Sequence, residues 1–234
     1  MEAGETLTTE NPLRAFFNQR TEGRGIWKWD HYFDVYDRHF RRFRDIGAHV
    51  LEIGVYSGGS LDMWAAYFGP NASIYGVDIQ PNCKAYESDQ VKIFTGDQGD
   101  RDFWRSFRKA VPKLDIVIDD GSHLPEHQQT SIEELLPHLT RGGVYLCEDV
   151  APGAAGLTPY IDKCANRLNA YEGYADDLTD AAPRISCTPN KWQQVVQSIH
   201  LYPYVVVIEK NAKPMSELVA PKHGTEWEPF YREL

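Results

Sequence analysis

The sequence predicts an α/β fold in which seven strands form a mostly parallel sheet, with helices on both faces and an antiparallel hairpin at the C-terminal end. Two observations carry this prediction. Short, β-rich apolar runs alternate with helical stretches through the middle of the chain, which is typical of a parallel sheet. Near the C-terminus two such runs are separated only by Pro203, and strands joined so tightly must pair antiparallel.

Each element follows from its local pattern. Aromatic residues at helical spacing predict a first helix over 30–44, with its arginines on the solvated face. Strands are expected at the β-rich apolar runs 49–53, 73–77, 91–95, 114–118, 143–147, 198–202 and 204–209. Further helices are expected at 60–68, 102–111 and 126–139. Ser60 is the expected N-cap of the helix that it begins.

The composition is that of a globular protein. The chain has 234 residues, and with 42% hydrophobic and 25% charged residues it fits neither a disordered nor a fibrous class. Because single domains run to roughly 250 residues, we expect one domain over 1–234, with an N-terminal extension at 1–29. The Gly-, Pro- and Asp-rich stretch 151–190 has weak periodicity, and we expect it to be a lid or a variable insertion.

Charge and hydropathy limit the partners. No apolar stretch approaches the roughly 20 residues of a membrane helix, and the polar N-terminus lacks the apolar core of a secretory signal. The sequence therefore predicts a cytoplasmic protein without membrane contact. A net charge of −10 disfavours binding to a phosphate backbone, so no nucleic-acid partner is expected. The four cysteines contain no C-x-x-C pair and predict neither a zinc ribbon nor a disulfide framework.

A glycine turn follows the first strand. Gly54 and Gly58 lead from the strand into a helix, and such a turn lets backbone approach a ligand and points helix N–H groups at an anion. The dinucleotide fingerprint G-x-G-x-x-G does not match, because Tyr56 occupies its second glycine position. An acid, Glu52, stands two residues before the first glycine. A tight strand–helix connection without a ligand is the alternative interpretation.

Two further acids follow the next two strands. Asp78 directly follows the run 73–77, and Asp97 lies two residues after the run 91–95. Ligands of open α/β sheets bind beyond the carboxyl ends of the strands, where a carboxylate can accept hydrogen bonds from ribose hydroxyls. Each of these acids alone is equally typical of a loop-capping aspartate.

The pattern of Glu52, Gly54 and Gly58 resembles the cofactor motif of class I S-adenosylmethionine-dependent methyltransferases, E/D-x-G-x-G-x-G, and departs from it at Tyr56. The resemblance implies a Rossmann-like methyltransferase fold and S-adenosylmethionine as cofactor. It places Glu52 and the turn at the amino-acid end of the cofactor and Asp97 near the adenine. The residues implied for cofactor binding are Glu52, Gly54, Tyr56, Ser57, Gly58, Ser60, Asp78, Asp97, Gln98 and Asp119.

A second acidic group ends two later strands. Asp119 and Asp120 follow the run 114–118, and Glu148 and Asp149 follow 143–147. These strands should be neighbours, so the carboxylates converge at one edge, where a hard cation would relieve their repulsion. Mg²⁺ prefers few carboxylates and keeps waters, which Asp120, Glu148 and Asp149 could satisfy as a half-shell. Helix caps and surface charge are the alternative.

The runs Asp-Asp-Gly-Ser-His at 119–123 and Glu-Asp at 148–149 resemble the metal-dependent sugar O-methyltransferases of the mycinamicin and macrocin type. The resemblance spans roughly 29–149 and the hairpin 199–209. It implies a divalent metal at Asp120, Glu148 and Asp149, and His123 as the catalytic base beside Asp120. The implied acceptor is a sugar, either on a glycosylated small molecule or in a saccharide, and a homo-oligomer is compatible with the resemblance. A catechol-like phenol as acceptor, a cephalosporin-hydroxylase-like protein and a non-catalytic S-adenosylmethionine-binding protein are the alternatives.

A second motif match and two tryptophans each have more than one interpretation. Residues 123–127 also match the zinc-protease signature H-x-x-E-H. Pro125 is tolerated only in the first turn of a helix, so His123 should precede the helix, and His127 should lie on the helix surface or support a site residue without contacting the ligand. Trp27 and Trp29 are either core anchors or, with Tyr56, an aromatic platform for the acceptor.

Overall fold

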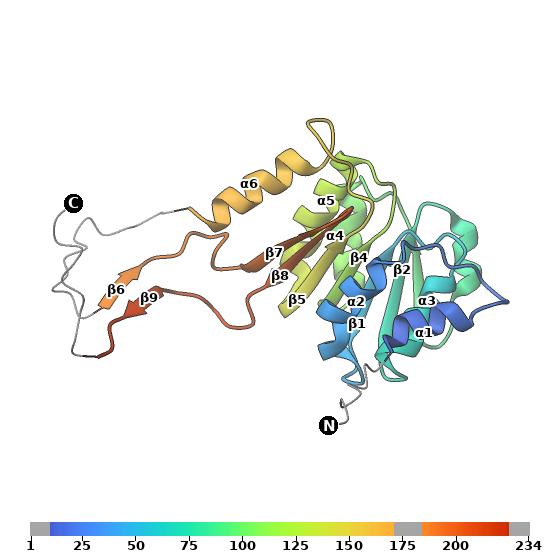
Figure 1. Ribbon diagram of the computed structural model, residues 1–234. Helices are drawn as coiled ribbons and strands as arrows, with labels where there is room; N and C mark the ends of the chain where they lie inside the picture. Colours follow the sequence, from blue (N-terminus) through green and yellow to red (C-terminus); the bar gives the residue numbers. More distant parts are fainter. Residues whose placement is uncertain (1–9, 171–183, 225–234) are drawn as a thin grey trace, which may run out of the picture.

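The centre of the computed structural model, which describes residues 10–170 and 184–224, is a seven-stranded sheet of order β3-β2-β1-β4-β5-β8-β7 (Figure 1). Its strands are β1 His49–Ile53, β2 Ser73–Asp78, β3 Val91–Thr95, β4 Leu114–Asp119, β5 Leu139–Cys147, β7 Val196–Tyr202 and β8 Val205–Lys210. The first five pair in parallel, and β8 runs antiparallel to both β5 and β7. The predicted fold class and the terminal hairpin are confirmed.

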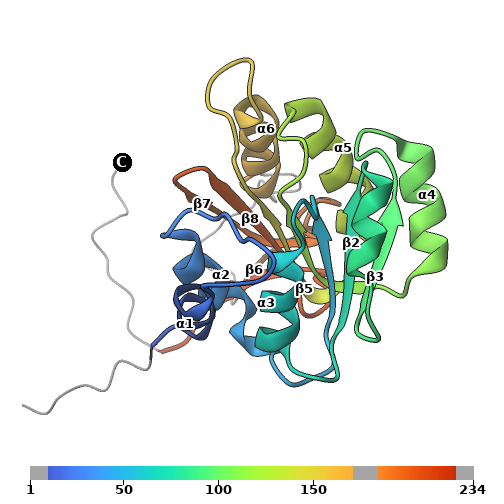
Figure 2. The same cartoon turned by 90° about the vertical axis from the view of Figure 1, so that its right-hand side faces the viewer.

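Helices cover both faces of this sheet, as predicted. They are α1 Pro12–Gln19, α2 Tyr32–Phe40, α3 Gly59–Phe68, α4 Arg101–Ala110, α5 Pro125–Leu135 and α6 Thr158–Leu168. α1, α2 and α3 lie on one side and α4, α5 and α6 on the other (Figure 2). A hydrophobic core lies on each face of the sheet, and alternate residues of each strand contribute to one core or the other. Val50 of β1 faces the first group of helices, and Leu51 faces the second.

The sheet has its topological switch point between β1 and β4. From β1 the chain moves outward to β2 and β3, and then returns to place β4 on the other side of β1. Ligands of open α/β sheets bind at the carboxyl ends of the strands beside such a point. The fold therefore places the binding region where the glycine turn and the acidic residues were expected.

Several boundaries differ from the sequence prediction. The helix expected at 126–139 ends at Leu135, because Pro137 lacks the N–H that would continue it, and residues Leu136–His138 form a 3-10 turn. The helix expected at 30–44 is α2 followed by the 3-10 turn Arg41–Phe43. The N-cap of α3 is Gly58, which has a φ of +73°, and not Ser60 as predicted. Ser60 lies inside the helix and its hydroxyl bonds Glu52 instead.

The segment 151–190 contains more structure than expected. Among its described residues are α6, which buries Ile161 and Cys164, and strand β6 Arg184–Cys187. β6 pairs antiparallel with β9 Leu218–Pro221 in a two-stranded sheet that lies away from the main one (Figure 1). None of the described residues of the segment 151–190 lines the cavity detailed below, so a role of this segment as a lid stays a prediction.

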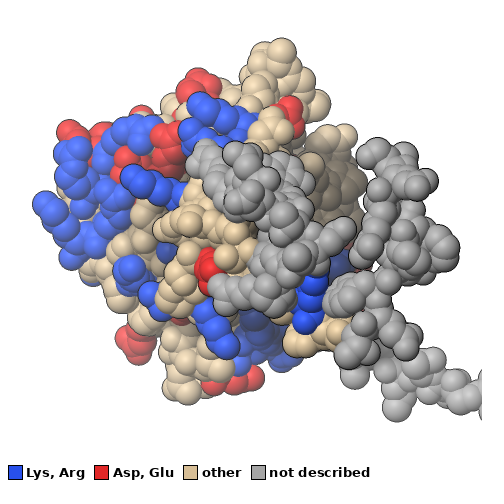
Figure 3. All heavy atoms as spheres, turned by 90° about the vertical axis from the view of Figure 1, so that its left-hand side faces the viewer, with Lys and Arg blue, Asp and Glu red and all other residues tan. Residues whose placement is uncertain are grey.

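The surface carries charges of both signs. On the face shown in Figure 3, lysines and arginines cover more of the described surface than aspartates and glutamates, so the net charge of −10 does not make this face acidic. Within residues 10–170 and 184–224, every helix is too short or too polar to cross a membrane.

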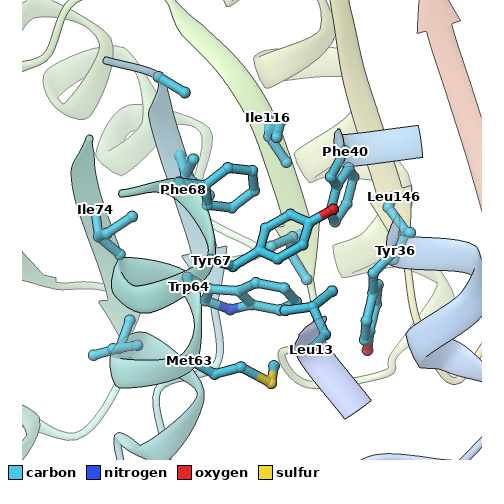
Figure 4. Close-up of a cluster of buried hydrophobic side chains, with 14 of the residues drawn as sticks. Leu13, Tyr36, Phe40, Met63, Trp64, Tyr67, Phe68, Ile74, Ile116 and Leu146 are labelled. Atoms are coloured by element: carbon cyan, nitrogen blue, oxygen red, sulfur yellow. The ribbon is translucent and has the colours of Figure 1, made fainter. Parts of the chain in front are cut away.

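An aromatic core fixes α2 and α3 against the sheet (Figure 4). Trp64 of α3 is fully buried and meets Tyr36 of α2 edge-on, with ring centroids 5.1 Å apart, and Phe40 at 6.1 Å. Edge-on aromatic pairs add about 0.5–1.5 kcal/mol each beyond the area they bury. This packing holds α2 in the position from which its tyrosines reach the ends of the strands.

Candidate active site

A cavity of about 950 Å³ opens at the carboxyl ends of β1, β2, β4 and β5. Its wall also includes the segment 25–30, which joins α1 to α2. The predicted site residues that line it are Gly54, Tyr56, Ser57, Ser60, Asp78, Asp120, His123, Glu148 and Asp149. The predicted residues Glu52, Gly58, Asp97, Gln98 and Asp119 are not part of this lining. The structure thus brings the glycine turn and the acidic cluster together around one space.

The glycine turn passes extremely close to the loop after β4. Gly54 has a φ of +88°, and a Cβ atom added to it would lie 2.0 Å from the backbone oxygen of Asp120. Only glycine permits both the backbone conformation and this approach. Tyr56 also has a positive φ, of +48°, and its side chain is 77% exposed, so the residue that replaces the motif's glycine points away from the backbone of the turn.

Asp78 lies at the end of β2 and braces the glycine turn. Its Oδ2 accepts from the backbone N–H groups of Val55 and Tyr56 at 2.9 and 3.1 Å, and its Oδ1 accepts from Gln80 at 2.8 Å. A carboxylate has about four acceptor sites, so Asp78 retains capacity for a ligand hydroxyl in the cavity.

Glu52 is fully buried at the end of β1. Its Oε2 accepts from the Ser60 hydroxyl at 2.7 Å and its Oε1 from the Trp64 indole at 3.0 Å. Burial raises the pKa of Glu52, against the opposing effect of Lys28 and of these two donors. Both oxygens therefore have protein partners beneath the cavity wall.

Gln98 and Asp119 brace the loop that carries the acidic cluster. The Gln98 amide donates to Asp119 Oδ1 and accepts from the backbone N–H of Ser122 at 2.9 Å. Tyr145 donates to Asp119 Oδ2 at 2.6 Å. Burial raises the pKa of Asp119 to about 7, although Tyr145 and Gln98 oppose the shift. Asp97 accepts from a backbone N–H two residues ahead in its own loop. The cofactor contacts expected of these residues stay predictions.

Asp120 and Glu148 converge, and a lysine joins them. Lys28 Nζ lies 3.0 Å from each oxygen of Glu148, contacts Asp120 Oδ2 and lies 3.7 Å from Glu52. Tyr36 donates to Glu148 Oε1 at 2.7 Å. Burial, and then the charge of Asp120, raise the pKa of Glu148 to about 8. Burial lowers the pKa of Lys28, but the three carboxylates outweigh it, so the net shift is upward and the ammonium stays charged.

Sequence reasoning missed Lys28, and also Tyr32 and Tyr36, which donate to Asp149 and Glu148. A single lysine between two tryptophans has no periodic or motif signal, and lysine is almost always solvent-exposed. The only available hint was the lack of a cation to balance the predicted acidic cluster.

Asp149 and His123 complete the cluster on its open side. Asp149 Oδ1 accepts from the Tyr32 hydroxyl at 2.7 Å and from the Trp29 indole at 3.1 Å. His123 Nε2 lies 3.9 Å from Asp120 Oδ1 and 3.8 Å from Asp149 Oδ2. His123 has a φ of +57° and precedes α5, as predicted, so it does not share a helical face with His127 and the zinc-protease geometry is absent.

The donor set fits a divalent cation. Ligand atoms of Asp120, His123 and Asp149 all lie within 4.8 Å of one another beside the cavity. His123 Nδ1 is buried and has no hydrogen-bond partner among the residues that the structure describes. Carboxylate oxygens next to open space are suited to a hard cation that keeps several waters.

Comparison with known proteins identifies the domain. Residues 51–150 match a family described as a methyltransferase domain. The chain is 32% identical over 214 residues to the 8-demethyl-8-(2-methoxy-alpha-L-rhamnosyl)-tetracenomycin-C 3'-O-methyltransferase of Streptomyces olivaceus, covering 85% of this chain and 54% of the relative. It is 34% identical over 191 residues to the mycinamicin VI 2''-O-methyltransferase of Micromonospora griseorubida, covering 75% and 47%.

The fold is also similar to that of a solved methyltransferase structure. MycE methyltransferase from the mycinamycin biosynthetic pathway, in complex with Mg and SAH, aligns with a TM-score of 0.68 and 28% identity, covering 86% of this chain and 54% of that one. The chain spans about half the length of the relatives it matches. It therefore carries a methyltransferase domain of the class I, Rossmann-like type, similar in sequence and fold to sugar O-methyltransferases of natural-product biosynthesis.

Proposed function

We propose that this protein transfers a methyl group from S-adenosylmethionine to a hydroxyl of a sugar on a small-molecule acceptor, with a divalent cation such as Mg²⁺. The observation that carries the proposal is the convergence of Asp120, His123 and Asp149 beside the glycine turn, around one cavity. The relatives named as sugar O-methyltransferases, and the MycE complex with Mg and SAH, support the same chemistry. The net charge of −10 favours a small acceptor over nucleic acid.

The cofactor would lie along the glycine turn. Gly54, Tyr56, Ser57 and Ser60 line this side of the cavity, and Asp78 has free acceptor capacity for the ribose hydroxyls. Behind them, Glu52, Gly58, Gln98 and Asp119 would act by holding the turn and the loop after β4 in place.

The acidic cluster would hold the cation through Asp120, Glu148 and Asp149. When bound, a divalent cation lowers the pKa of a coordinated hydroxyl. His123 Nε2, on the open side of the cluster, would take the proton that the hydroxyl loses, since an imidazole nitrogen within reach of the reacting group can act as a general base. The cavity walls would hold the hydroxyl in line with the methyl group, which accounts for much of the rate in a displacement.

The test is methyl transfer from labelled S-adenosylmethionine to a panel of glycosides and catechol-like phenols. We expect labelled glycoside with Mg²⁺ and none in EDTA, with recovery when Mg²⁺ is restored. Labelling of the phenols alone would change the acceptor class, and full turnover in EDTA would contradict the metal role.

A variant separates the two halves of the site. Asp120→Asn should abolish turnover while S-adenosylmethionine still binds in calorimetry, because the Asp120 side chain contacts Lys28 and faces His123, whereas Asp78 braces the glycine turn. Asp162→Asn on the exposed face of α6 is the matched control and should keep full turnover. Loss of cofactor binding in Asp120→Asn would contradict the division into two sites.

A further inference from the structure

The side chain of Lys28 is only 3% exposed, although it belongs to a segment without regular structure. Its ammonium lies 3.0 Å from both oxygens of Glu148 and also contacts Asp120 Oδ2. A buried ammonium is tolerated only where carboxylates neutralise it. Lys28 therefore occupies a position built for a cation.

That position is the one that a metal ion held by the same carboxylates would take. Glu148 has both oxygens on Lys28 and one of them also on Tyr36, so the ammonium takes up the position in front of both carboxylate oxygens. Asp120 turns Oδ2 toward Lys28 and only Oδ1 toward His123. A divalent ion bound by Asp120 and Glu148 would lie against the ammonium, and two cations so close repel one another strongly.

Lys28 is also mechanically linked to the cavity wall. It is flanked by Trp27 and Trp29, whose side chains are 88% and 54% exposed and which line the cavity. The Trp29 indole donates to Asp149 Oδ1, so the segment is anchored to the acidic cluster at two points, and Lys28 is the charged one. Movement of Lys28 would therefore displace both indoles.

We propose that Lys28 is an internal counter-cation that holds the position between Asp120 and Glu148 until a divalent ion displaces it, and that its withdrawal moves the cavity wall formed by Trp27 and Trp29. The inference rests on the metal site of the proposed function. Binding of the divalent ion would therefore change the shape of the cavity on the side where the acceptor binds.

The first test measures Mn²⁺ affinity by electron paramagnetic resonance of the free ion, with no acceptor present. Lys28→Met removes the competitor, so this variant should bind Mn²⁺ about tenfold or more tighter than the unmodified protein. Lys28→Arg keeps the charge and should bind no tighter than the unmodified protein. Lys109→Met, at an exposed lysine of α4, is the matched control and should leave the affinity unchanged.

An equal or weaker affinity in Lys28→Met would overturn the proposal, because it would mean that Lys28 orients the ligands and does not compete. If neither protein binds Mn²⁺, both this inference and the metal role of the proposed function fail. If Mn²⁺ binds as expected but no glycoside is methylated, only the proposed function fails.

The second test follows tryptophan fluorescence during a Mg²⁺ titration and does not depend on the folding of any Lys28 variant. The unmodified protein should change its emission as Mg²⁺ binds, since two of its exposed tryptophans move. The double variant Trp27→Phe, Trp29→Phe should lose most of that change. Unchanged emission in the unmodified protein, at Mg²⁺ concentrations where calorimetry shows binding, would overturn the proposed movement.

Discussion

The hydroxyl of Ser60 donates to Glu52 Oε2 across 2.7 Å, and both residues are buried. This bond ties the first turn of α3 to the end of β1, directly beneath the glycine turn. Trp64, one turn further along α3, donates to the other carboxylate oxygen. The acid of the cofactor motif thus fixes the helix whose N-terminus forms one wall of the cavity.

Ser60→Ala should lower the free energy of unfolding by about 1.5–3 kcal/mol, because a buried carboxylate loses a hydrogen-bond donor. Urea denaturation measures this difference. Ser106→Ala, at an exposed position of α4, should change stability by less than about 0.5 kcal/mol. Equal losses in the two variants would contradict a special role for the buried bond.

Gly54→Ala should be strongly destabilising and should also weaken divalent-ion binding. An alanine Cβ would lie 2.0 Å from the backbone oxygen of Asp120, so the loop with the acidic cluster must shift. Overpacking and the positive φ together should cost about 3 kcal/mol or more. Denaturation and Mn²⁺ binding measure the two effects.

Gly142→Ala provides the control for Gly54→Ala. Gly142 has a φ of +73°, but the nearest atom to its added Cβ would lie at 3.6 Å, an ordinary contact. This variant should show only the backbone strain, about 1–2 kcal/mol, with Mn²⁺ affinity unchanged. If both variants lost the same stability and the same affinity, the close approach at Gly54 would not be the cause.

Local patterns were sufficient to predict the main sheet. β-rich runs such as 91–95 and 114–118 are strands at those positions, because apolar composition and flanking turns are local properties. The pairing of β6 with β9 was not predictable in this way. About thirty residues separate these strands along the chain, and each is only four residues long, too short for its pattern to predict a strand. Pairing of such segments depends on tertiary context rather than on propensity.

The site was predictable in location but not in detail. Carboxyl ends of neighbouring parallel strands meet at one edge, so the convergence of Asp120 and Glu148 followed from the strand order. Whether a strand-end acid faces the cavity or the core depends on the exact end of the strand, and Asp119 is enclosed while Asp120 reaches the cavity. Lys28 lies in a segment without regular structure, and no local pattern in the sequence predicts the path of that segment.

Tyr32→Phe should weaken Mn²⁺ affinity about tenfold. Tyr32 donates to Asp149 Oδ1 at 2.7 Å, and partners that orient a metal-binding carboxylate typically contribute 10–100-fold to affinity. Tyr75→Phe removes the hydroxyl of a buried tyrosine that contacts His49 on β1, away from the cavity, and should leave the affinity unchanged. Undiminished affinity in a folded Tyr32→Phe protein would show that Asp149 needs no such orientation.

A second group of potential metal ligands links α2 to the terminal hairpin. Ligand atoms of His39, His200 and Glu209 lie within 4.8 Å of one another. Both ring nitrogens of His39 are already engaged, one with Glu209 Oε1 at 2.7 Å and the other with the Tyr202 hydroxyl at 2.9 Å. The Arg42 guanidinium lies 3.4 Å from the same Glu209 oxygen. We therefore interpret the group as a polar link that stabilises the fold.

This link predicts a pH dependence of stability. The hydrogen bond from His39, and then the charge of Arg42, lower the pKa of Glu209 from 4.5 to about 2. Because the folded-state pKa is depressed, the ionised carboxylate stabilises the fold above pH 4.5, and this contribution is lost as the pH falls toward 2. A difference of this size corresponds to at most about 3 kcal/mol.

Glu209→Gln should therefore be less stable than the unmodified protein near pH 7 but lose less stability on acidification, as followed by urea denaturation. Glu22→Gln, at an exposed glutamate, should follow the profile of the unmodified protein. Parallel profiles for Glu209→Gln and the unmodified protein would exclude Glu209 as a source of acid sensitivity.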